Sequence, residues 1–100
     1  MIDEHAFFKL LNENPLFLGY FTSPECAVCK SLLPKLEAAL EPLDQVSFHI
    51  LNCQDEKWLC GQHLVFSVPT LLIFYHGREV KRFSRFISVA DVPDFVDKML

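Results

Sequence analysis

Glycine is scarce in this sequence, and its scarcity excludes one class of site. The chain has three glycines in 100 residues, and they do not form the glycine-rich loop that holds the phosphates of a nucleotide. Runs of basic residues are also missing, and the formal net charge is −4. Because nucleic acids and anionic membranes bind basic faces, we expect neither as a partner.

The sequence also lacks segments that direct a chain into or across a membrane. It begins MIDEHAFFKLL, with acidic residues early and no basic region, so a secretory signal is not predicted. The longest apolar stretch, LVFSVPTLLIFY, is too short to span a bilayer and contains Pro69. We therefore expect a soluble cytoplasmic protein. In that reducing compartment, a structural framework made from its four cysteines is not expected.

What the chain does have is enough apolar material for one core. Apolar residues make up 51% of the sequence, and ten of them are phenylalanine. No repeat, low-complexity segment or linker interrupts the chain. We therefore expect a single domain over residues 1–100.

Residue patterns predict helices and strands that alternate along this domain. The first helix should be capped by Asp3 and end at residues 12–15, and a second should run from Cys26 to Pro42. A short helical or irregular segment covers residues 55–63, and a last helix should be capped by Ser88 or Asp91. Strands are predicted at residues 16–22, 46–51, 70–75 and 79–85, the last as a polar edge strand. This order predicts an α/β fold, with a central mixed β-sheet flanked by helices on both faces.

Two cysteines, Cys26 and Cys29, lie where the first strand leads into the second helix. Their spacing is common by chance, but their position is informative. Unpaired N–H groups and the helix dipole at a helix start favour a thiolate, which is the nucleophile in disulfide exchange. Cys26 is thus the predicted attacking residue, and Cys29 the shielded resolving residue. Lys30 should assist Cys26, Glu25 should oppose it, and the chemistry needs no cofactor or metal.

The remaining cysteines and rings have simpler interpretations. Cys53 and Cys60 are seven residues apart, which is a poor match to a zinc site, so we interpret them as small buried apolar residues. The four histidines form no metal-ligand pattern, and we expect those in the second predicted strand and in the turn after residue 75 to lie on the surface. The one tryptophan, Trp58, should serve packing, with a position flanking the cysteine pair as the alternative. Core positions are expected for three late phenylalanines, Phe83, Phe86 and Phe95.

Over almost its whole length the chain resembles the thioredoxin family. The resemblance rests on CAVCK at the start of a helix, on Pro34, on FSVPTLLIFYHG at residues 66–77, and on the order of elements. It implies a thioredoxin-like fold with Pro69 in the cis form beside the cysteine pair. It also implies that the backbone of Val68 binds an extended substrate. The chain departs from the family where Tyr20 stands in place of a buried aspartate.

Two functions follow from these observations. The first is a thiol–disulfide oxidoreductase that uses the Cys26–Cys29 dithiol. Its partners would be disulfide-containing proteins or small molecules, and a separate reductase would supply electrons. The alternative is a thioredoxin-fold binding or adaptor module whose cysteines exchange slowly or not at all.

Overall fold

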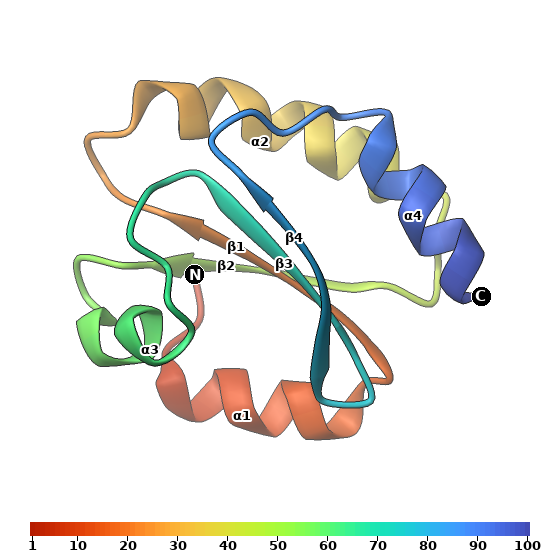
Figure 1. Cartoon of the computed structure of the whole chain (residues 1–100), viewed down its shortest axis with the longest axis horizontal. Helices are drawn as coiled ribbons and strands as arrows, with labels where there is room; N and C mark the ends of the chain where they lie inside the picture. The colour runs from red at the N-terminus through yellow and green to blue at the C-terminus, as the bar shows by residue number, and fades with distance from the viewer.

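The computed structural model describes residues 1–100 as a four-stranded sheet covered by helices on both faces (Figure 1). The helices are α1 (Glu4–Glu13), α2 (Ala27–Leu40), α3 (Lys57–Gln62) and α4 (Asp91–Met99). The strands are β1 (Leu16–Thr22), β2 (Ser47–Asn52), β3 (Thr70–Tyr75) and β4 (Arg78–Ser84). None of these helices combines the length and the apolar character needed to span a membrane.

The sheet is mixed, as the sequence predicted. Its strand order is β2-β1-β3-β4, with β1 parallel to β2 and antiparallel to β3, and with β3 antiparallel to β4. β4 therefore lies at an edge, in agreement with its polar sequence. Figure 1 shows α2 and α4 on one face of the sheet, and α1 and α3 on the other.

The alternation of side chains on β1 divides the apolar interior into two clusters. Leu16, Leu18 and Tyr20 point toward α2 and α4, whereas Phe17 and Phe21 point toward α1 and α3. Because helices cover both faces, every residue of β1 is buried. This explains why the strand reads as a continuous apolar run rather than as an alternating one.

Helix capping was predicted correctly at α1 and wrongly at α4. The Asp3 side chain accepts a hydrogen bond from the Ala6 N–H at 2.9 Å, as expected of an N-cap. In α4 the cap position is Ala90, which makes no side-chain capping bond, and Asp91 is the first helical residue. A carboxylate within the first turn still interacts favourably with the helix dipole, which accounts for an aspartate just inside the helix.

The predicted burial or exposure of three side chains is wrong, and so is one prediction about cysteines. Phe86 is 94% exposed, in the loop between β4 and α4, and Trp58 is largely exposed on α3. His49 on β2 is half-buried rather than on the surface, because its ring stacks on Phe17 with the centroids 5.4 Å apart.

The wrong prediction about cysteines concerns Cys53 and Cys60, which form a disulfide with a Cα–Cα distance of 5.8 Å. After β2 the chain turns sharply, because the Asn52 carbonyl accepts hydrogen bonds from the backbone N–H groups of Asp55 and Glu56. This turn carries α3 back toward the end of β2 and brings Cys60 to Cys53. Both residues still pack in the cluster under α1, as small apolar residues would.

Candidate functional site

The candidate site is the start of α2, where Cys26 occupies the N-cap position. Its Sγ accepts a hydrogen bond from the Cys29 N–H at 3.1 Å. The same two residues form a disulfide with a Cα–Cα distance of 5.3 Å. A sulfur that caps a helix receives both a donor and the positive end of the dipole, so this position stabilises a thiolate once the disulfide is reduced.

The two cysteines differ in their access to solvent. Cys26 is half-buried, whereas Cys29 is 1% exposed and belongs to the cluster beneath α2 and α4. An incoming molecule can therefore reach Cys26 more easily than Cys29. Lys30 lies one residue further along, is exposed, and donates its backbone N–H to the Cys26 carbonyl. Glu25, on the other side of Cys26, is exposed as well.

Tyr20 contacts the second cysteine through the backbone, a role that the sequence did not predict. Its side chain is fully buried, and its hydroxyl donates a hydrogen bond to the Cys29 carbonyl at 2.9 Å. Burial raises the pKa of Tyr20 to about 12. The hydroxyl therefore keeps its proton at neutral pH and fastens the start of α2 to β1, and it does not act as a base for Cys29.

The turn before β3 borders the same region. The peptide bond between Val68 and Pro69 is cis. Val68 and Cys26 both pack against the cluster that contains Cys29. The backbone N–H and C=O of Val68 make no hydrogen bond to another backbone group. These two free groups are what an extended peptide needs in order to add as a short strand.

Arg82 on β4 supports the segment that leads to this turn. Its guanidinium donates to the carbonyls of His63 and Leu64 at 2.6 and 2.9 Å, and it also binds Glu79. The bond to Glu79 raises the pKa of Arg82 further. The segment after α3 is thus fastened to the edge strand of the sheet.

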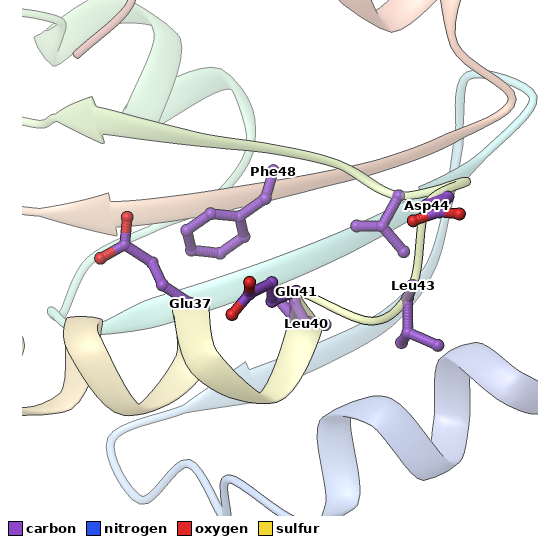
Figure 2. A pocket seen from close by; sticks show the side chains of 7 residues that line it. Glu37, Leu40, Glu41, Leu43, Asp44 and Phe48 are labelled. Atoms are coloured by element: carbon purple, nitrogen blue, oxygen red, sulfur yellow. The ribbon is translucent and has the colours of Figure 1, made fainter.

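The structure also has a groove away from the cysteines, at the C-terminal end of α2. Its volume is about 370 Å³. Figure 2 shows the carboxylates of Glu37 on α2, of Glu41 at the C-cap of that helix and of Asp44 on the following loop, with the Phe48 ring between α2 and β2. Across the whole chain, no three His, Cys, Asp or Glu side chains are grouped so that they could hold a metal ion.

Comparison with known proteins gives consistent matches. A family model described as Thioredoxin matches residues 1–98. The chain is 35% identical to the thioredoxin-like protein YdfQ of Bacillus subtilis, over 68% of this chain and 61% of that protein. It is 33% identical to a protein disulfide-isomerase of Humicola insolens, over 73% of this chain but only 15% of that protein. The match therefore spans less than two thirds of the length of either relative.

A solved structure matches the fold more completely than either sequence relative. A mutant thioredoxin from Halobacterium salinarum superposes with a TM-score of 0.87, at 20% identity. The match covers 95% of this chain and 83% of that one. The likeness of fold thus extends over nearly all of this chain.

Proposed function

The chain belongs to the thioredoxin family, and on that premise we propose that it is a thiol–disulfide oxidoreductase acting through Cys26 and Cys29. In this proposal residues 1–100 form one thioredoxin-like domain that carries its own dithiol. The observation that carries the proposal is the position of Cys26, whose Sγ caps α2 and accepts a hydrogen bond from the Cys29 N–H. Relatives named as a thioredoxin-like protein and a protein disulfide-isomerase support the same chemistry.

The first step uses the more accessible sulfur. The Cys26 thiolate attacks one sulfur of a substrate disulfide, whose S–S bond breaks as the new Cys26–substrate bond forms. The other substrate sulfur leaves as a thiolate and takes a proton. The half-buried Cys26 is the attacking residue because an incoming disulfide cannot reach Cys29, which is 1% exposed.

The second step stays within the protein. Cys29, as thiolate, attacks the Cys26 sulfur, which breaks the mixed disulfide and releases the second substrate thiol. The products are the Cys26–Cys29 disulfide and a substrate reduced by two electrons. A separate reductase or thiol donor then returns two electrons and two protons to the pair. The Cα–Cα distance of 5.3 Å is short enough for this closure.

Val68, Pro69 and Lys30 have supporting roles in the proposal. The free backbone groups of Val68, held next to Pro69, bind the substrate segment that flanks its cysteine. Lys30 is four residues after Cys26, which places both on the same helical face, and its positive charge favours the Cys26 thiolate. The expected substrates are disulfide-containing proteins or small molecules, and the cytoplasm stays the predicted location.

The proposal is tested by trapping the mixed disulfide. Reduced Cys29→Ser protein, mixed with a disulfide-linked peptide, should accumulate an adduct through Cys26, because the resolving thiol is gone. Cys26→Ser should accumulate none, and Cys53→Ser should behave as the unmodified protein. Mass spectrometry of the digested adduct identifies the residue. Adducts formed only through Cys29 would reverse the assigned roles. Absence of exchange in the unmodified protein would favour the binding or adaptor module instead.

A further inference from the structure

The loop between β4 and α4 and the first turns of α2 enclose a groove that begins two residues after Cys26. Its volume is about 340 Å³, and its lining is mostly apolar: Val28, Leu32, Arg85, Phe86, Ile87 and Ser88. Figure 1 shows this loop passing along α2 on the same face of the sheet. Val28 therefore places one wall of this groove inside the cysteine motif, two residues along the chain from Cys26.

Two apolar side chains of the groove are unusually open to water. Phe86 is 94% exposed and Val28, inside the cysteine motif, is 59% exposed. Grouped apolar side chains on a surface commonly mark a binding site, because covering them releases free energy. The exposed Phe86 ring has no packing role in this fold, so its apolar surface is available to pack against a bound segment.

Arg85 gives the groove its only charge. Its backbone has φ of 64°, a left-handed conformation that disfavours residues other than glycine. Its N–H donates to the Pro69 carbonyl at 3.1 Å, which joins this loop to the turn that carries Val68. The side chain is exposed and takes no part in an ion pair, since the structure's one ion pair joins Arg82 to Glu79. A guanidinium that is free in this way is ready to bind a carboxylate.

We propose that Arg85 and Phe86 determine substrate specificity, by selecting disulfide-linked segments that carry an apolar side chain and a carboxylate next to the reactive cysteine. The inference rests on the proposed function, because it describes the molecules that Cys26 attacks. The apolar side chain lies against Phe86 and Val28, and the carboxylate binds Arg85. The Val68 backbone across the turn holds the extended main chain of the same segment.

The test uses two disulfide-linked peptides that differ at one position, Asp in one and Lys in the other, beside a leucine and the reactive cysteine. Their kcat/KM values are compared at low salt, with a thiol donor in excess to reduce the Cys26–Cys29 disulfide after each turnover and with the uncatalysed rate subtracted. Arg85→Gln should lower the ratio of the Asp to the Lys peptide by about threefold, the effect expected of an exposed ion pair. Arg78→Gln is the matched control, because it removes the same charge at the far end of β4 and should leave the ratio unchanged. In 1 M salt the ratios of all three proteins should converge.

Phe86→Ser should lower kcat/KM about tenfold for both peptides, while reduction of the neutral hydroxyethyl disulfide stays unchanged because that molecule is too small to need the groove. An equal change of the ratio in Arg85→Gln and Arg78→Gln would overturn the inference, as would a Phe86→Ser protein that reduces the peptides normally. If the unmodified protein reduces hydroxyethyl disulfide without preferring the Asp peptide, this specificity alone is wrong. If it reduces no disulfide at all, the proposed function is wrong too.

Discussion

Removing the hydroxyl of Tyr20 should weaken the attachment of the cysteine helix to the sheet by a calculable amount. Tyr20→Phe keeps the buried ring and deletes one hydrogen bond, the 2.9 Å bond to the Cys29 carbonyl. A hydrogen bond of this kind contributes about 0.5–1.5 kcal/mol net. Only one buried oxygen atom is removed and no donor is left unpaired, so the free energy of unfolding should fall by about 1 kcal/mol. For a chain of this size that lowers Tm by about 4–8 °C.

Urea unfolding of the oxidised protein at pH 7, followed by circular dichroism, measures this difference. The m-value should stay constant, because the surface exposed on unfolding does not change. Tyr75→Phe is the matched control: of the two tyrosines, Tyr20 alone donates its hydroxyl to another residue. Tyr75→Phe should therefore change the stability by less than about 0.5 kcal/mol. Equal stabilities of Tyr20→Phe and Tyr75→Phe would refute the assigned role of the bond.

Alkaline pH gives the same residue a second test. Burial raises the pKa of Tyr20 to about 12 from its ordinary value of 10.0. In that interval the folded protein holds a proton that the unfolded chain has released. The contribution to stability is therefore fully present below pH 10 and is lost as the pH rises toward 12. Tyr20→Phe should lose less stability than the unmodified protein over this range, and identical losses would contradict the argument from burial.

Two further changes test other parts of the fold. Cys53→Ala should lower the free energy of unfolding of the oxidised protein by about 2–3 kcal/mol, because the Cys53–Cys60 bond restricts the unfolded chain. The deficit should shrink sharply when both proteins are unfolded in dithiothreitol, and a deficit that persists there would show that packing, not the bond, was lost. Burial lowers the pKa of His49 below its model-peptide value of 6.5, so its contribution to stability is present above pH 6.5 and is lost on acidification. His49→Phe, which keeps a ring against Phe17, should therefore lose less stability than the unmodified protein between pH 7 and pH 5 in urea titrations.

The sequence by itself determined the features that depend on neighbouring residues. The apolar runs at residues 16–22 and 70–75 predicted the strands β1 and β3, the order of the elements predicted helices on both faces, and the polar sequence of β4 predicted an edge. Asp3 was identified as a cap, and Cys26 was placed at a helix start, because capping needs contacts only three residues apart. The resemblance to the thioredoxin family then identified the fold from motifs that are themselves local.

Tertiary structure alone decided which distant groups meet. The hydrogen bond from the Tyr20 hydroxyl to the Cys29 carbonyl joins a strand to a helix, and the spacing of the two residues in the sequence does not predict it. Cys53 and Cys60 meet because the turn after β2 reverses the chain, which a count of seven residues does not reveal.

Phe86 was expected in the core because it is aromatic, yet the core positions of this face were already filled by Ile87 and the residues of α4. Periodicity reports which side chains share a face of one element. Packing among segments far apart in the chain decides which element covers that face, and which side chain stays exposed and available to a substrate.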